Sequence, residues 1–289
     1  MTSKKMLHQN GKIPLIAAVK YPNQRKLSYD TTQYIANGQY HDVRTMKTDR
    51  MPWQKFYRQQ GSRVMIENGK IMGFPGPRNE FYCLETNGKG MAIFLGTEPE
   101  TKHEDYAKDL ITTASKLGIG SIIFLDESIS PIVPHTREAY YYYGCGLNTS
   151  DDTRLCPLNE DRENGGVCPM VMLHAQNQGI EAIGLEIVVP EYMIGHAYAK
   201  NYPYMQRLAH MAHKLSGMPI NPSFLDNEVT EYHNRYIAQM MSDIDARAHI
   251  AEMEYQFDRA WGRNNTEQHI LLSPEIEQFL NELQHPPDC

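Results

Sequence analysis

The sequence lacks the features that mark several large classes of protein. Its 289 residues contain no block of basic residues, and 35 acidic against 28 basic side chains give a formal charge of -7. That balance disfavours a nucleic acid as a partner. No run approaches the roughly 18 apolar residues of a transmembrane helix, and the start MTSKKMLHQNGK has no apolar segment behind its lysines. We expect a soluble, cytoplasmic protein that binds neither nucleic acid nor a membrane.

Cysteine is scarce, and its spacing argues against a disulfide or metal framework. The five cysteines are an odd number without a C-x-x-C pair, in a chain long enough to bury a core without cross-links. A metal site would have to gather Cys156, Cys168 and His174, whose spacing matches no zinc pattern. We therefore expect free thiols, no metal and no cofactor. The five are Cys83, Cys145, Cys156, Cys168 and Cys289.

Two common catalytic loops are missing as well. There is no Gly-x-Ser-x-Gly nucleophile elbow, and Gly120-Ser121 stands at the start of a predicted strand, the wrong end for one. The stretch GFPGPRNEF (73–81) has two glycines and an arginine, but no Lys-Ser or Lys-Thr follows. We interpret it as a rigid turn set by two prolines. Serine hydrolase and phosphate-loop chemistry are therefore disfavoured.

What is present is enough apolar sequence for a full core, since 41% of the residues are hydrophobic. The run KIPLIAAVKYP (12–22) predicts an early buried strand. Residues 23–61 have weak periodicity and predict no clear element. Asn68-Gly69, between two short apolar runs, predicts a hairpin, and Asn87-Gly88 predicts a further turn.

From Phe81 onward the pattern predicts alternating strands and helices. A strand over 91–95 is followed by a helix over 104–117, with Gly118 at its C′ position, and then by a strand over 119–126. Short connections of this kind predict a parallel, right-handed βαβ crossover.

A second unit of the same kind follows a long polar stretch. Residues 148–166 are nearly all polar and predict a surface loop. A helix from Pro169 to Gly179, a core strand over 180–190 and a helix over 201–217 come next.

The sequence pattern changes after Pro222, where apolar residues recur every three or four positions. This predicts two amphipathic helices broken near Ser242-Asp243, and a short helix over 274–283 before the tail. We expect an α/β core domain over 1–220, with a C-terminal helical hairpin and tail over 221–289 packed on it.

The stretch VPHTR, just beyond the strand at 119–126, is the leading candidate site. Open α/β sheets bind ligands beyond the carboxyl ends of their strands, where His135, Thr136 and Arg137 would lie. Arg137 could bind a carboxylate or another anion, with His135 as an acid or base. The alternative is that these side chains hold a loop or a subunit contact together.

Glu98, in the turn GTEP after the strand at 91–95, is the second candidate. The acidic residues that follow it suit the first turn of a helix, but Glu98 precedes that helix. If the strands at 91–95 and 121–125 are neighbours, Glu98 and Arg137 could meet as an ion pair. A structural pair is then favoured over a catalytic one.

Four tyrosines, Tyr140 to Tyr143, lie where the pattern predicts a strand, so alternate rings should face opposite sides. Aromatic rings bury well and keep a polar tip. One pair could enter the core while the other lines a cleft or an interface, with core packing as the default.

Taken in order, these stretches resemble a known family. The matching parts run from about Phe94 to Phe257: GTEP, LGIGSIIFLDESISPIVPHTR, GGVCPMVMLHAQNQGIEAIGLEIVVPEYM, NYPYMQRLAHMAHKLSGMPI and the helical hairpin. They are similar to the proteasome assembly chaperone type two family of archaea and actinobacteria, whose members are often labelled ATP-grasp-like or carboxylate-amine ligase. The run IAAVKYP departs from the family because it lacks the glycine-rich stretch that many members carry.

The resemblance implies a mixed sheet flanked by helices, similar to the purine nucleoside phosphorylase-like fold, and a homo-oligomer. Trimers are implied for the actinobacterial-like branch, which this chain resembles most. Archaeal members that escort proteasome subunits end in a hydrophobic-tyrosine-any tail, whereas this sequence has Pro287-Asp288-Cys289. An aspartate at the tyrosine position argues against that way of docking.

Two functions follow from the sequence. The first is an oligomeric chaperone or scaffold without chemistry of its own, which binds a protein client through exposed helices and the tyrosine-rich strand. The second is a ligand-binding protein or a ligase- or phosphorylase-like enzyme with a crevice near Glu98, His135, Thr136 and Arg137. Fold alone does not decide between them, but the missing catalytic loops favour the first.

Overall fold

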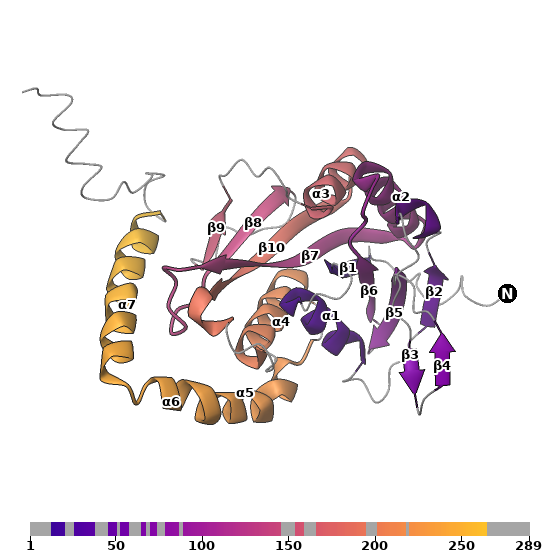
Figure 1. Cartoon of the computed structure of the whole chain (residues 1–289). Helices are drawn as coiled ribbons and strands as arrows, with labels where there is room; N and C mark the ends of the chain where they lie inside the picture. The colour runs from indigo at the N-terminus through magenta and orange to yellow at the C-terminus, as the bar shows by residue number, and fades with distance from the viewer. Residues whose placement is uncertain are drawn as a thin grey trace, which may run out of the picture.

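The described residues of the computed structural model form one large mixed sheet with helices on both faces (Figure 1). The sheet has eight strands in the order β2-β5-β6-β1-β7-β10-β8-β9, and β3 and β4 pair separately. The described residues are 13–20, 26–37, 46–50, 53–57, 65–67, 70–73, 79–86, 89–145, 154–158, 166–194, 201–217 and 220–264.

Four parallel strands form the centre of the sheet. They are β6 (Lys89–Thr97), β1 (Ile13–Lys20), β7 (Ile119–Ser130) and β10 (Glu181–Pro190). These strands read as nearly continuous apolar runs because helices cover both faces of the sheet. The four predicted core strands are confirmed, and β7 extends four residues beyond the predicted end at 126.

Helices form a layer on each face of the sheet. Helices α2 (His103–Lys116) and α3 (Cys168–Asn177) contact each other on one face, and α1 (Leu27–Asn37) and α4 (Tyr202–Ser216) on the other. The predicted helices α2, α3 and α4 are confirmed. Gly118 and Gly217, which follow α2 and α4, have φ values of 77° and 63°, the left-handed conformation that ends many helices.

Antiparallel strands make the sheet mixed. On one side β6 pairs with β5 (Glu80–Thr86), which pairs with β2 (Met46–Arg50); on the other, β10 pairs with β8 (Tyr140–Cys145). The last strand, β9 (Leu155–Pro157), runs parallel to β8. β3 (Met65–Glu67) and β4 (Lys70–Gly73) form the predicted hairpin. The turn residues 68–69 and 87–88 lie outside the described residues, as does most of 73–81.

Three expectations need correction. Residues 23–61 contain helix α1. The sequence does not show the apolar periodicity of a helix here, because the buried face of α1 carries Ser28, Thr31 and Thr32. The two threonine hydroxyls donate to carbonyls one turn earlier, at 2.8 Å each, so both threonines are satisfied inside the core, whereas the buried Ser28 hydroxyl has no hydrogen-bond partner among the described residues. The predicted surface loop 148–166 includes β9, where Leu155 is buried. Finally, β1 lies between β6 and β7, so these parallel strands are not neighbours.

The C-terminal helices form an arm: α5 and α6 run below the core in Figure 1, and α7 turns upward along its side, near the end of β7. It consists of η3 (Pro222–Leu225), α5 (Asp226–Tyr232), η4 (His233–Ile237), α6 (Ala238–Met240) and α7 (Ile244–Asn264). The predicted break at Ser242-Asp243 is confirmed. The Asp243 carboxylate accepts the backbone N–H groups of Asp245 and Ala246, at 2.8 and 3.1 Å, and so caps α7. The predicted helix over 274–283 and the tail lie outside the described residues.

A small apolar cluster holds α7 against the rest of the chain. Phe257 is buried with Val133, Ala139 and Val188. Trp261 stacks on Phe257 with ring centroids 5.0 Å apart and also contacts Tyr141. Helix α7 therefore docks through one short apolar seam, whereas Tyr232 and Ile237 of the arm's earlier helices are buried in the main core.

The four tyrosines of β8 alternate as predicted. Tyr140 and Tyr142 pack on the core that faces α1 and α4. Tyr143 packs on the opposite core, and Tyr141 packs against the α7 cluster. All four rings are thus used within the chain, and Tyr140 is fully buried.

Two general features concern the described part of the chain. No helix there is long and apolar enough to cross a bilayer. Cys83, Cys156 and Cys168 are free thiols, in agreement with the expectation for those three, and no three metal-ligating side chains are grouped there.

The contact of Tyr143 with Gly184 in β10 gives a first prediction. A Cβ atom at Gly184 would lie 2.4 Å from the Tyr143 ring, so Gly184→Ala should lower the free energy of unfolding by about 1–3 kcal/mol. In a Tyr143→Ala background the same change should cost much less, because the clash is gone. Urea unfolding of the four proteins measures the coupling, and equal costs in both backgrounds would contradict it.

Candidate functional site

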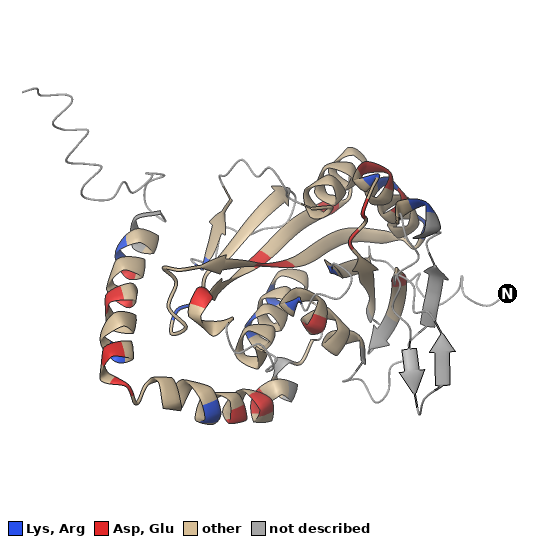
Figure 2. Cartoon of the chain, viewed as in Figure 1, with Lys and Arg blue, Asp and Glu red and all other residues tan. Residues whose placement is uncertain are grey.

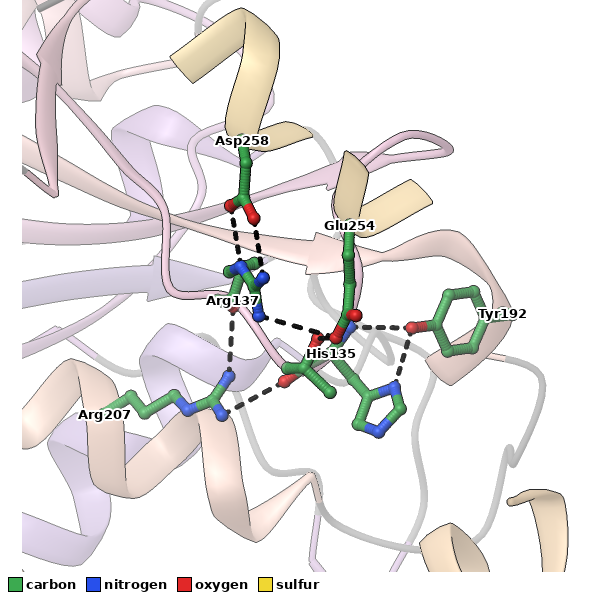
Figure 3. Close-up of polar contacts among 7 residues, drawn as sticks. His135, Arg137, Tyr192, Arg207, Glu254 and Asp258 are labelled. Carbon is green, nitrogen blue, oxygen red and sulfur yellow. Dashed lines mark hydrogen bonds and ion pairs between the residues drawn. The ribbon is translucent and has the colours of Figure 1, made fainter. Parts of the chain in front are cut away.

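The VPHTR stretch forms a tight turn between β7 and β8. The Arg137 N–H donates to the Pro134 carbonyl at 3.1 Å, and Val133 is buried. Because Pro134 restricts the residue before it to extended conformations, the turn is stiff. It presents His135, Thr136 and Arg137 to helices α4 and α7 and to η2 (Glu191–Met193) (Figure 3).

Arg137 is clamped to α7. Its Nε and Nη2 donate to the two carboxylate oxygens of Asp258, at 2.8 and 2.7 Å, and Nη1 lies 3.4 Å from Glu254 Oε1. The Thr136 hydroxyl donates to the same Glu254 oxygen. The hydrogen bonds from Arg137 hold the pKa of Asp258 below its ordinary value. The Arg137 guanidinium thus already forms a bidentate pair with the Asp258 carboxylate, the kind of contact that a bound carboxylate ligand would otherwise make.

His135 is held by Tyr192 of η2. The Tyr192 hydroxyl accepts the His135 backbone N–H at 2.7 Å and lies 2.9 Å from Nδ1. The tautomer of the imidazole decides whether Nδ1 or the hydroxyl donates in the second contact. Burial, and then the nearby Arg207 guanidinium, lower the pKa of His135. We infer a neutral, structurally engaged imidazole.

Arg207 of α4 fastens the turn from the other side. Its Nη2 donates to the His135 carbonyl at 3.1 Å and its Nη1 to the Arg137 carbonyl at 3.4 Å. Figure 3 shows Arg207 and the α7 carboxylates on opposite sides of the turn. VPHTR therefore joins α4, η2 and α7.

Glu98 lies in a different polar cluster, at the end of β6. Its Oε1 accepts the backbone N–H of Val167 at 2.7 Å, directly before α3, and its side chain is buried at 3% exposure. Burial raises the pKa of Glu98 to about 7, although the Val167 hydrogen bond and Lys26 oppose the shift. Gly166 is part of the fit, because a Cβ atom there would lie 3.0 Å from Glu98 Oε1.

Glu127 of β7 likewise accepts backbone N–H groups at the start of a helix, in this case α1. Its two carboxylate oxygens accept the backbone N–H groups of Leu27 and Ser28, at 3.0 and 2.9 Å. Burial raises the pKa of Glu127, while Lys26 opposes the shift. Lys26 forms an ion pair with the neighbouring Asp126 at 2.9 Å. Acidic residues in the middle of β7 and β10 are the red stretches inside the sheet in Figure 2.

Both helix starts at this edge are thus occupied by the chain's own carboxylates. A helix N-terminus binds anions because its first N–H groups lack partners in the helix. Here Glu127 fills that position on α1 and Glu98 fills it at α3, on opposite faces of the sheet. A phosphate or carboxylate ligand would have to displace the buried Glu98 at α3 or the partly buried Glu127 at α1.

The structure therefore brings together three of the four predicted site residues. His135, Thr136 and Arg137 share one junction, whereas Glu98 contacts the start of α3. The conditional ion pair between Glu98 and Arg137 is wrong, because β1 separates β6 from β7 and Arg137 pairs with Glu254 and Asp258.

Sequence reasoning missed the partners of these residues. Glu254 and Asp258 are one turn apart on α7 and flank its buried stripe, so amphipathic patterning marks them only as a polar edge. Arg207 and Glu127 likewise follow from the packing of distant elements. The only local signal is Glu127, a charged residue directly after the predicted core strand at 119–126.

The Arg137 clamp gives a second prediction. An exposed ion pair contributes little to stability, so Arg137→Gln should lower the free energy of unfolding by about 1 kcal/mol or less. Amide hydrogen exchange within 244–264 should nevertheless become several-fold faster, because α7 loses its polar anchor. Arg259→Gln, next to Asp258, is the control with the same charge change. Unchanged exchange in α7 would show that the apolar seam alone holds it.

The raised pKa of Glu98 gives a third prediction. The folded state holds this proton up to about pH 7, whereas the unfolded carboxyl loses it near its ordinary pKa, so the stability contribution declines as pH rises between those values. Glu98→Gln should remove this decline. The free energy of unfolding of the variant minus that of the wild type should therefore rise by roughly 1–3 kcal/mol from pH 4 to pH 8. Parallel stability curves for the two proteins from pH 4 to 8 would refute the assignment.

Comparisons with solved structures agree with this fold. A Mycobacterium tuberculosis protein of unknown function matches with a TM-score of 0.71 at 16% identity, covering 88% of each chain. A Corynebacterium glutamicum protein of unknown function matches with a TM-score of 0.71 at 15% identity, covering 91% of this chain and 97% of that one. A proteasome-assembly chaperone homologue of Mycobacterium tuberculosis gives 0.66 at 16%, covering 82% and 100%. At such identities the likeness concerns the fold.

The family is shown by the sequence itself. A comparison with curated proteins found no match. The model of the PAC2 family matches residues 31–240, which include the central strands β6, β7 and β10, the VPHTR turn and the first part of the arm. The chain therefore belongs to the PAC2 family.

Proposed function

We propose that this chain is an oligomeric, chaperone-like scaffold that binds other proteins through its C-terminal helices and uses no catalytic centre. The observation that carries the proposal is that α7 has two apolar stripes. The inner stripe, Ile250, Met253 and Phe257, is buried. The outer stripe, on the same helix, is open in the described part of the chain.

The outer stripe follows helical spacing. Ile244 and Tyr255 are 72% and 63% exposed, and the exposed residues Ala248 and Ala251 lie between them at steps of four and three. Large apolar side chains at both ends of a small central patch suit contact with another helix. Charged residues of both signs are spread along the arm (Figure 2), and charged residues are typical of the rim of protein interfaces.

The filled anion positions support the same conclusion. In open α/β sheets, ligands usually enter beyond the carboxyl ends of the strands. Here Glu98 and Glu127 bind the helix starts in that region, and Arg137 is engaged by Asp258. Family membership adds support, since one relative in fold is described as a proteasome-assembly chaperone homologue.

Several finer parts of the proposal rest on the resemblance. We propose that the chain forms a homo-oligomer, specifically a trimer, and that it belongs to the actinobacterial branch of the family. The purine nucleoside phosphorylase-like class of the fold, the division at 220/221 into core and helical hairpin, and a cytoplasmic location belong to the same proposal. The tyrosine-rich strand is left out of the partner surface, because its rings pack within the chain.

The alternative function is a ligand-binding protein or enzyme, ligase- or phosphorylase-like as the ATP-grasp-like label suggests. The buried Glu98, with its pKa near 7, is the one observation that favours it. A thermal-shift screen with nucleotides and nucleosides tests it. A ligand that binds the wild type but not Glu98→Gln or Arg137→Gln would favour this alternative over the scaffold.

The outer stripe of α7 gives the fourth prediction. Changing Ile244→Glu together with Tyr255→Ser should raise the dissociation constant of the homo-oligomer about tenfold or more, since a charge replaces an apolar contact. Both side chains are exposed, so the circular dichroism spectrum and melting temperature of the protomer should change little. Native mass spectrometry and sedimentation velocity measure the assembly.

The matched control changes two exposed polar residues of the same helix, Glu252→Ala and Arg259→Ala, and should assemble as the wild type does. An oligomer unaffected by the Ile244/Tyr255 change would remove α7 from the subunit contact. Loss of binding to purified proteasome subunits, with assembly intact, would assign the stripe to a client instead. A wild type that is monomeric and binds neither itself nor such subunits would overturn the proposal.

A further inference from the structure

Two α7 helices that pair along their outer stripes, as proposed above, can run in the same direction or in opposite directions. The stripe residues from Ile244 to Tyr255 follow one another at steps of four, three and four, which is the spacing of a coiled-coil seam. The next seam position is Asp258, whose carboxylate binds Arg137. The seam therefore spans about three helical turns, and the charged residues on its two flanks decide the direction.

The core of each subunit lies away from this seam. At about 100° per residue, the outer stripe and the buried stripe of Ile250, Met253 and Phe257 lie roughly 160° apart around α7. Figure 1 shows α7 at the margin of the chain. A neighbouring α7 and the core of its own subunit thus occupy opposite sides of the helix, so neither direction of pairing brings the two cores together.

The two flanks of the seam carry different charges. Arg247 and Glu254 lie on one flank, and Asp245, Glu252 and Arg259 lie on the other. Glu254 already contacts the VPHTR turn, whereas the other four residues are exposed. The direction of pairing decides which of these charges face each other.

Parallel helices place opposite charges together. Rotation about an axis along the helices brings one flank of α7 against the other flank of its neighbour, with each residue close to the one five positions later. Arg247 then faces Glu252 of the partner subunit. Arg247 has no carboxylate partner among the described residues. Glu252 accepts one hydrogen bond, from Gln256 Nε2 to Oε1 at 2.8 Å, so its other oxygen can accept the guanidinium.

Antiparallel helices place like charges together. The stripe reads large, small, small, large from either end, so its apolar residues permit this direction as well. Like flanks then meet: Asp245 faces Glu252 of the partner subunit, twice in each pair, and the carboxylates repel each other. On the other flank Arg247 faces Glu254 of the partner subunit, which the turn already binds. The flanks therefore favour the parallel direction.

We propose that α7 pairs with α7 of a second copy in the parallel direction and in register, with Arg247 against Glu252 of the partner subunit. This arrangement rests on the proposed assembly through α7. Parallel pairing relates the copies by rotation about an axis that runs along α7, and such an axis closes with two or three subunits. It is therefore compatible with the proposed trimer, whereas an antiparallel contact is used up by a single pair.

Cysteine cross-linking of the full chain tests the direction. In a parallel pair the two copies of residue 244 are neighbours, so Ile244→Cys should form a disulfide with its own copy under mild oxidation. In an antiparallel pair the two copies lie about 16 Å apart along the axis. Ile244→Cys would then cross-link to Tyr255→Cys in a mixture of the two variants. Peptide mapping by mass spectrometry separates these bonds from any at the native cysteines.

Charge reversal measures the flanks independently. Arg247→Glu or Glu252→Arg alone should raise the dissociation constant of the assembly about tenfold in sedimentation velocity, because each places like charges across the contact. The double variant should return to within about threefold of the wild type. In an antiparallel pair Glu252→Arg would instead tighten the assembly, because it would face Asp245.

Two controls accompany these variants. Removing a charge, as in the Glu252→Ala control above, costs little because an exposed ion pair contributes little. Glu181→Arg, an exposed position outside α7, has the same charge change as Glu252→Arg and should leave the assembly unchanged.

Self-cross-linking at 244 together with rescue by the double charge reversal supports the parallel pair. A cross-link between 244 and 255, tighter assembly of Glu252→Arg, or failure of the double variant to recover would each overturn it, while assembly through α7 would stand. An oligomer with neither cross-link overturns both the parallel pair and the role of α7 in the subunit contact. A monomeric wild type overturns the oligomer itself, and the parallel pair with it.

Discussion

The pairing of two glutamates, one buried and one partly buried, with helix starts is the constraint on which the rest of this structure depends. Glu98 directly follows strand β6, Glu127 lies within strand β7, and they bind the first amide groups at α3 and α1, one on each face of the sheet. Each glutamate side chain loses contact with water but accepts hydrogen bonds from backbone amides at the positive end of a helix dipole. The two helix layers are thereby fixed relative to the strands, and the region where such folds usually hold anions is filled from within.

The second junction, at VPHTR, connects this rigid centre to the arm. A stiff turn receives Arg207 from α4, Tyr192 from η2 and two carboxylates from α7. His135, Thr136 and Arg137, which the sequence predicts as a ligand site, thus use their hydrogen-bonding groups to connect η2 and α7 to the turn. Arginine and histidine side chains serve both purposes with the same hydrogen-bonding groups, so only the identity of the partner distinguishes a structural junction from a binding site.

The central strands and the helices α2, α3 and α4 could be predicted because each has an apolar pattern that local sequence displays. Helix α1 could not, since Ser28, Thr31 and Thr32 take buried positions that apolar residues usually occupy. The placement of β1 between β6 and β7 was also hidden, because strand order is set by packing between distant segments. For the same reason VPHTR could be singled out, but not Asp258 or Glu254 as its partners.

The clamp between the turn and the arm joins residues that lie far apart along the chain: Thr136 and Glu254 are separated by 118 positions, and Arg137 and Asp258 by 121. During synthesis the sheet and its four helices leave the ribosome before α7 does, so the core can fold first. Until α7 arrives, Val133, Ala139 and Tyr141 have no cover from the arm. The newly made chain thus passes through a stage with a bare hydrophobic seam, at which a neighbouring nascent chain could insert its own α7 and produce an exchanged dimer.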